Sequence, residues 1–130
     1  MTGVTITRIG IRRAARLSCC VTLGVAVIGS LAPHMGPPES HYLDKVVHVA
    51  GYGALTLQIG LSLHRRNPVL VAGLIALLLG GGLELAQCWV PGRSGSWDDF
   101  AANALGVLAG MAATRHALTL ITKRLLPSNH

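Results

Sequence analysis

The sequence predicts an all-α integral membrane bundle of about four transmembrane helices. Of its 130 residues, 51% are hydrophobic and only 12% are charged, whereas soluble domains carry about 25% charged residues. The mean hydropathy is +0.52, and the apolar residues are gathered in four long runs. This composition argues against a soluble enzyme and against a disordered chain, and the length limits the protein to a single domain.

The four apolar runs predict helices over residues 17–33, 45–63, 69–90 and 99–121. A helix needs about 20 apolar residues to cross a bilayer, so the third and fourth runs suffice alone and the first two need flanking residues. Pro33 and Pro91 close the first and third runs. The connectors are short, which predicts that helices adjacent in sequence pack antiparallel.

The basic residues are sorted along the chain in a way that predicts orientation. A net charge of +6 would suit a nucleic-acid partner, but aromatic residues make up only 4%, so no such partner is expected. Lys45 and Arg93 alone fall on one side of four crossings. The other nine fall on the opposite side: Arg8, Arg12, Arg13, Arg16, Arg65, Arg66, Arg115, Lys123 and Arg124. Because positive charge collects on the inner side, we expect a multi-pass protein of the cytoplasmic membrane with both termini cytoplasmic.

Three aromatic residues and three cysteines fit the same topology. Tyr42, Trp89 and Trp97 would then lie at the outer interface, where amphipathic rings prefer to be. Cys19 and Cys20 fall near the inner end of the first helix and Cys88 near the outer end of the third, too far apart for a disulfide between the two groups.

The first predicted helix also has the outline of a secretory signal peptide, since basic residues precede an apolar run. No Ala-x-Ala cleavage pattern follows it, and Pro33 comes directly after the best small residue, Ala32. We therefore expect the first helix to be retained as an anchor.

Polar side chains inside the second and third predicted helices need an explanation, because ionisable groups are costly at membrane depth. Asp44, His48 and Tyr52 are spaced i, i+4, i+8 and share one helical face. Glu84 and Gln87 are i, i+3 neighbours in the third helix. A buried carboxylate such as that of Glu84 must pair with another group or remain protonated.

The last predicted helix carries a second polar face. Asp99 and Asn103 are i, i+4 neighbours, and the same face continues into Gly106 and Gly110. Two glycines four residues apart allow another helix backbone to approach closely.

The predicted orientation places all these polar residues in the outer half of the bundle, where they form one polar cavity with both signs of charge. We assign Glu84, His48 and Asp99 as candidate acid–base groups. The candidate binding residues are Asp44, Lys45, Gln87, Arg93 and Asn103.

Structural explanations stand beside these assignments. Asp44 and Asp99 could each cap a helix, or Ser96 could cap the last one. Glu84 could form an ion pair with Arg93 or His48. Gln87 and Asn103 could join helices. A metal site would need Asp44, His48 and Glu84 with His34 or His41; its spacing is not diagnostic, and no metal is expected.

The polar residues together resemble the pattern of the VanZ-like membrane protein family. That pattern is Asp-Lys-x-x-His, then Glu-x-x-Gln with an Arg in the next loop, then Asp-x-x-x-Asn-x-x-Gly. The matching residues are Asp44, Lys45 and His48; Glu84, Gln87 and Arg93; and Asp99, Asn103 and Gly106. The resemblance covers residues 44–110. Val49 stands where the family usually has a bulkier residue, and the first helix carries no motif.

The resemblance implies a membrane protein that binds or acts on an envelope lipid, a lipid-linked precursor or its head group. The family's named member is associated with low-level resistance to teicoplanin. No cofactor is expected, because Gly80, Gly81 and Gly82 lie within an apolar helix without the Lys or Ser/Thr of a nucleotide loop. Whether the chain is an enzyme stays open. The alternatives are a non-catalytic scaffold whose polar residues fix helix packing, and a small ion-coupled carrier that uses Glu84.

Overall fold

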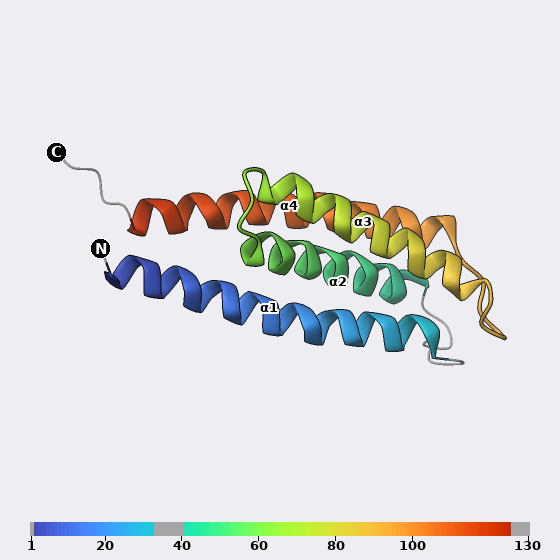
Figure 1. Ribbon diagram of the computed structural model, residues 1–130. Coiled ribbons are helices and arrows are strands. Elements are labelled where there is room, and N and C mark those ends of the chain that lie inside the picture. The colour runs from blue at the N-terminus through green and yellow to red at the C-terminus, as the bar shows by residue number, and fades with distance from the viewer. Residues whose placement is uncertain (1, 33–40, 126–130) are drawn as a thin grey trace.

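The computed structural model describes residues 2–32 and 41–125, and these residues form a bundle of four α-helices. Helices adjacent in sequence run antiparallel, and the first helix begins at the same end of the bundle at which the last helix ends (Figure 1). The predicted all-α bundle is therefore confirmed. The helices are α1 (Thr2–Leu31), α2 (His41–Ser62), α3 (Pro68–Gln87) and α4 (Trp97–Leu125).

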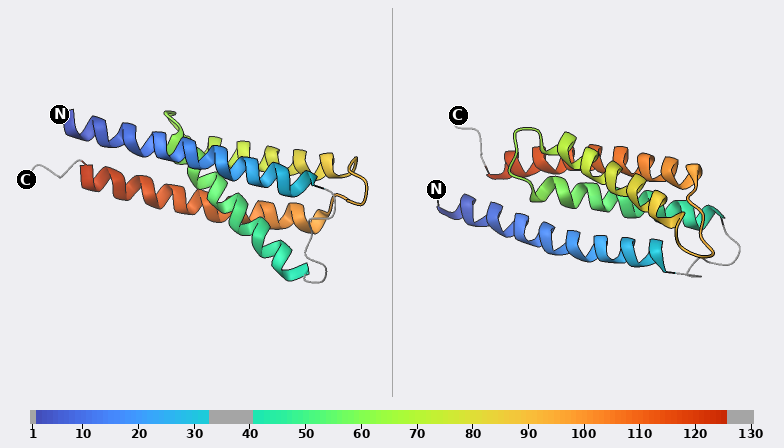
Figure 2. Two further views of the ribbon diagram at one scale, coloured as in Figure 1. Left: turned by 90° about the horizontal axis from the view of Figure 1, so that it is seen from below. Right: turned by 45° about the vertical axis from the view of Figure 1, so that its right-hand side comes forward.

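Three of the described helices are long and apolar enough to cross a membrane, by length and composition: residues Thr7–Leu31 of α1, all of α3 and all of α4. Helix α2 was the second predicted crossing, and it is not among them. It has 22 residues, but it packs against all three other helices and crosses them obliquely (Figure 2). Its neighbours cover much of its surface, so α2 needs fewer apolar residues than a helix that faces lipid on most sides.

The helix boundaries differ from the hydropathy runs at several ends, by four residues at the start of α2 and at the end of α4, and two of the differences have a clear local cause. Helix α1 begins at Thr2 rather than at residue 17, because hydropathy marks the apolar part of a helix and Arg and Ala in the preceding turns are good helix formers. Helix α3 ends at Gln87 rather than at residue 90. Pro91 disfavours helical backbone in the residue before it, and Cys88, Trp89 and Val90 form turns with the carbonyls three residues earlier.

Helices α1 and α4 are longer than the other two and project beyond the turn between α2 and α3 (Figure 1). They contain 30 and 29 residues, against 22 and 20 for α2 and α3. At about 1.5 Å per residue the difference amounts to roughly 10–15 Å. Lys123 and Arg124 lie in the last turn of α4, and Arg12 and Arg16 of α1 bond to His64 and to the Ser62 carbonyl where α2 ends. The sorting of charge along the sequence therefore becomes a basic end of the bundle.

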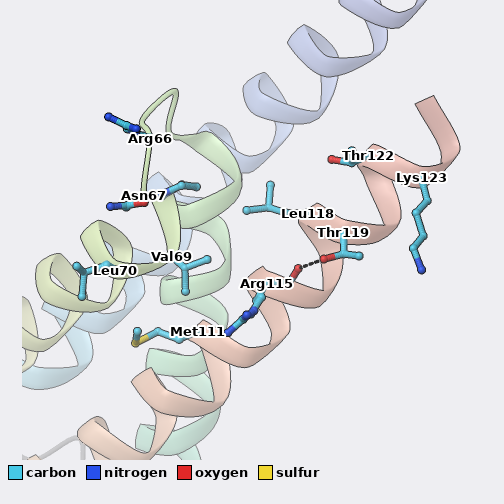
Figure 3. A pocket seen from close by; sticks show the side chains of 11 residues that line it. Arg66, Asn67, Val69, Leu70, Met111, Arg115, Leu118, Thr119, Thr122 and Lys123 are labelled. Atoms are coloured by element: carbon cyan, nitrogen blue, oxygen red, sulfur yellow. Dashed lines mark hydrogen bonds between the residues drawn. The ribbon is translucent and has the colours of Figure 1, made fainter. Parts of the chain in front are cut away.

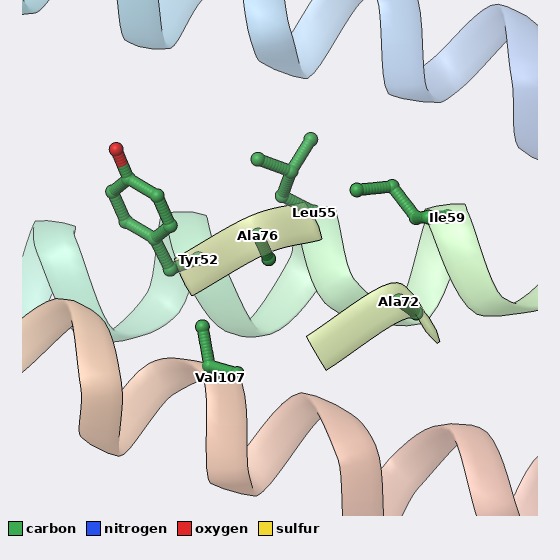
Figure 4. Close-up of a cluster of buried hydrophobic side chains, with 6 residues drawn as sticks. All are labelled: Tyr52, Leu55, Ile59, Ala72, Ala76 and Val107. Carbon is green, nitrogen blue, oxygen red and sulfur yellow. The ribbon is translucent and has the colours of Figure 1, made fainter. Parts of the chain in front are cut away.

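The core lies where α2, α3 and α4 meet (Figure 4). Its buried side chains are Tyr52, Leu55 and Ile59 from α2, Ala72 and Ala76 from α3, and Val107 from α4. Small residues let α2 and α4 touch through their backbones. A Cβ atom added to Gly106 would overlap the Val49 carbonyl oxygen, and one added to Gly110 would lie 2.5 Å from the Gly53 carbonyl oxygen. The close approach predicted for Gly106 and Gly110 is confirmed.

Candidate functional site

The polar cluster lies at the end of the bundle opposite the start of α1 and the end of α4, and Glu84 is at its centre. Glu84 is only 8% exposed. Its Oε2 accepts a hydrogen bond of 3.0 Å from the Ser96 backbone N–H, and its Oε1 accepts one of 3.4 Å from Asn103 Nδ2. Three polar groups from different segments therefore meet at this carboxylate, because His48 Nε2 from α2 also lies 3.9 Å from Oε1.

The loop between α3 and α4 brings Ser96 to Glu84. Gly92 adopts a φ of 80°, which favours glycine. Further along, a Cβ atom on Gly95 would overlap the Glu84 carbonyl oxygen, so the loop returns directly over the end of α3. Ser96 directly precedes α4: its Oγ accepts a hydrogen bond of 3.4 Å from the Asp99 N–H, and its carbonyl accepts one from the Phe100 N–H.

This geometry settles the capping alternatives. Ser96 caps α4, and Asp99 lies in the first turn rather than at the cap position. Asp44 also lies in a first turn, because α2 begins at His41. Explaining Asp44 and Asp99 as helix caps is therefore wrong, although both carboxylates lie near helix N-termini, where the backbone dipoles favour negative charge.

His48 is oriented by its own helix. Its Nδ1 lies 2.9 Å from the Asp44 carbonyl oxygen and 3.7 Å from Asp44 Oδ1. A carbonyl oxygen can only accept, so the proton belongs on Nδ1, and Nε2 is left facing Glu84. The Glu84–His48 pair thus has a fixed imidazole face opposite a buried carboxylate, an arrangement suited to proton exchange with a bound molecule.

The two cations at this end of the bundle, Lys45 and Arg93, bind groups other than Glu84. Lys45 Nζ lies 3.1 Å from Asp98 Oδ2. Arg93 Nη2 donates to the Gly29 and Ala32 carbonyls at the end of α1, at 2.9 and 3.3 Å. Of the two partners considered for Glu84, the structure therefore brings His48 to it and directs Arg93 to α1.

Gln87 and Asn103 both join helices. Gln87 Nε2 donates to the Ser30 carbonyl of α1 at 3.2 Å. Asn103 is 1% exposed, and its Oδ1 is buried without a hydrogen-bond partner among the described residues. Together with Arg93, Gln87 attaches the end of α1 to the loop and to α3, which fixes one wall of the cluster.

Two cavities lie on either side of the cluster. A cavity of about 360 Å³ between α1 and α2 is lined by Asp44, His48, Tyr52, Gln87 and Arg93 among others. A larger groove of about 640 Å³ runs between α3 and the start of α4. Apart from Glu84 and Ser96 its lining is largely apolar, and Trp97 and Phe100 stand edge to face at its mouth with ring centroids 6.3 Å apart.

One group of side chains has the geometry of metal ligands. Donor atoms of Asp44, His48 and Asp99 lie within 4.8 Å of one another, so Asp99 takes the place that sequence reasoning gave to Glu84. Two carboxylates and an imidazole are compatible with a divalent cation. His34 and the side chain of His41, the further ligands considered from the sequence, lie outside the described residues.

Sequence reasoning named the side chains of the cluster and missed its backbone groups. Backbone groups cannot be recognised from the residue types in a sequence. Those of the cluster are the Ser96 N–H, which binds Glu84, and the α1 carbonyls of Gly29, Ser30 and Ala32. The Pro91-Gly92 pair marks a turn and was the only available hint that the loop folds back over α3.

These features define a helical membrane protein with a polar cluster at one end of its bundle. Residues 9–120 match the model of the VanZ/LLP1 family. The chain belongs to this family, which confirms the resemblance seen in its motifs, and the match includes most of α1, where no motif was recognised. Neither the curated proteins nor the solved structures compared with the chain include a match.

Proposed function

We propose that the polar cluster binds the head group of an envelope lipid or lipid-linked precursor on the extracytoplasmic side of the cytoplasmic membrane, and that this activity contributes to teicoplanin resistance. One observation carries the proposal. The Glu84–His48 pair, with 3.9 Å between Oε1 and Nε2, lies between a cavity whose lining includes Asp44 and Arg93 and a groove whose lining is largely apolar. An amphipathic molecule needs both kinds of surface at one depth.

The cavity between α1 and α2 offers groups for both charge signs of a head group. Arg93 lines it, and of its guanidinium nitrogens only Nη2 has a partner among the residues described. Nε and Nη1 are left to bind an anionic oxygen such as that of a phosphate. Asp44 and His48 line the same cavity and can accept hydrogen bonds from hydroxyl or ammonium groups.

If the bound molecule is also transformed, Glu84 or Asp99 is the acid–base group and His48 its proton partner. A proton taken by Glu84 can pass to His48 Nε2, because Nδ1 is held by the Asp44 carbonyl and Nε2 faces the carboxylate. Lys45 reaches the cluster only by leaving Asp98, and both side chains of that pair are solvent-accessible.

The experiment compares two histidine variants in the host cell. His48→Gln removes the site imidazole, whereas His116→Gln changes an exposed histidine of α4 that has no hydrogen bond or ion pair with a described residue and is far from the cluster. We expect His48→Gln to restore teicoplanin susceptibility and to lower the lipid recovered with the purified protein, and His116→Gln to do neither. Normal membrane levels of His48→Gln with full resistance and full lipid recovery would overturn the proposal.

A second function has specific support, namely a scaffold in which the cluster only fixes helix packing. Glu84, Gln87 and Arg93 each bind a backbone group of another segment. Glu84→Gln separates the two functions. Its amide oxygen can still accept from Ser96, and Asn103 can turn its unpartnered Oδ1 toward the new amide, so folding survives. A scaffold keeps its activity in this variant, whereas a binding or catalytic site loses it.

A further inference from the structure

A second feature lies at the opposite end of the bundle, in the step where α4 projects beyond the start of α3. A groove of about 600 Å³ opens there between the two helices. Its floor is apolar and includes Val69, Leu70 and Met111. Arg66 and Lys123 stand on opposite rims, and Arg115 lies between them beside Met111 (Figure 3). The polar cluster plays no part in this groove.

The three cations of the groove are not neutralised within the protein. Among residues 7–32 and 42–125, whose side chains the structure describes, neither guanidinium nor the ammonium group has a hydrogen bond or ion pair. The described acids, Asp44, Glu84, Asp98 and Asp99, all lie at the other end of the bundle. The groove therefore has a positive potential that only a bound anion can offset.

A smaller cavity beside the groove also indicates a missing anionic partner. It has a volume of about 70 Å³, shares Leu118 and Thr122 with the groove, and is lined on the α1 side by Arg8 and Arg12. Arg8 Nε is buried there without a hydrogen-bond partner in the described part of the chain. A buried unpaired guanidinium N–H is costly, so this is a second and independent sign of a missing anionic partner.

The apolar floor identifies the kind of anion. Helices α3 and α4, which form the floor, are both apolar enough to cross a membrane, and the groove lies near the end where their basic residues begin. An anionic phospholipid matches this arrangement, with its phosphate among the cations and an acyl chain along the floor. Basic pockets between membrane helices are known to hold such head groups.

We propose that the groove between α3 and the projecting part of α4 is a binding site for an anionic phospholipid, held by Arg66, Arg115 and Lys123. The site is separate from the polar cluster and does not depend on the function proposed for it. Inorganic phosphate shares the head-group chemistry but has no acyl chain to pack on the apolar floor, so it binds this groove weakly.

The test measures lipid binding to the purified full-length chain in neutral detergent by native mass spectrometry. The probes are phosphatidylglycerol, phosphatidylcholine with the same acyl chains, and inorganic phosphate. The test variant is Arg66→Gln/Arg115→Gln/Lys123→Gln. The matched control is Arg13→Gln/Arg65→Gln/Arg124→Gln, which removes the same three charges from exposed positions of the basic end that do not line the groove.

We expect phosphatidylglycerol to bind more tightly than phosphatidylcholine. The groove variant should lose about a hundredfold in affinity for it, given a few-fold for each cation near a membrane surface, and the control less than about threefold. The single variant Arg115→Gln should lose about fivefold while leaving the rest of the bundle intact. Equal losses in the two triple variants, equal binding of the two lipids, or displacement of phosphatidylglycerol by millimolar phosphate would each overturn the proposal.

Discussion

The contact between α2 and α4 makes Gly106→Ala the most informative single substitution in the bundle. An alanine Cβ at position 106 would lie 3.0 Å from Val49 Cα and 3.1 Å from Gly53 N, and it would overlap the Val49 carbonyl oxygen. All three are backbone atoms, so no side-chain rotation relieves the overlap. The two helices must separate instead.

The cost follows from the size of that separation. Restoring ordinary contact requires a shift of about 1 Å, and a gap of this size removes a quarter to a half of the dispersion energy of each contact across it. The affected interface is the close packing of Val49, Gly53 and Thr56 of α2 against Gly106 and Gly110 of α4. We expect a loss of about 3 kcal/mol in the free energy of unfolding, at the upper end of the usual cost of overpacking.

The matched control is Gly24→Ala in α1. A Cβ atom at position 24 meets nothing within 4 Å, so only the helix preference of alanine over glycine remains, which stabilises by up to about 1 kcal/mol. The two glycine-to-alanine changes are therefore expected to have opposite signs. SDS titration in detergent micelles, followed by far-UV circular dichroism, measures both. A Gly106→Ala protein as stable as the parent chain would refute the reasoning.

Three further predictions concern the polar end. A double-mutant cycle with Lys45→Gln and Asp98→Asn should give a coupling below about 1 kcal/mol that fades in high salt, because the two side chains are 42% and 76% exposed; a larger, salt-insensitive coupling would contradict this. Ser96→Ala should cost about 1 kcal/mol of unfolding free energy through loss of the α4 cap. Ser94→Ala, in the same loop, should cost almost nothing, because the Ser94 side chain is exposed and has no hydrogen bond to a described residue. A membrane-impermeant maleimide applied to intact cells should label the exposed Cys88 and spare the two cysteines of α1; the reverse pattern would disprove the orientation inferred from the basic residues.

The sequence predicted the helical bundle well because the positions of apolar residues along a membrane protein largely determine where its helices form. The four apolar runs, the prolines that close two of them and the short connectors each reflect a local constraint. The Gly106 and Gly110 pair belongs to the same class, since small residues at helical spacing predict a close approach wherever the partner helix comes from. Hydropathy was less informative about helix ends, because the basic turns of α1 continue the helix beyond its apolar part.

By itself the sequence determined which residues gather at each end of the bundle: the carboxylates, His48 and the aromatic residues at one, most of the cations at the other. Only the tertiary structure decided which side chains and backbone groups contact one another. Arg93 binds the carbonyls at the end of α1, and Glu84 receives the Ser96 N–H and faces His48 instead. The reason is physical. Spacing along one helix fixes which face a side chain occupies, but its partners depend on how a loop folds back and on unpaired backbone groups, which are the same in every residue and leave no trace in the sequence.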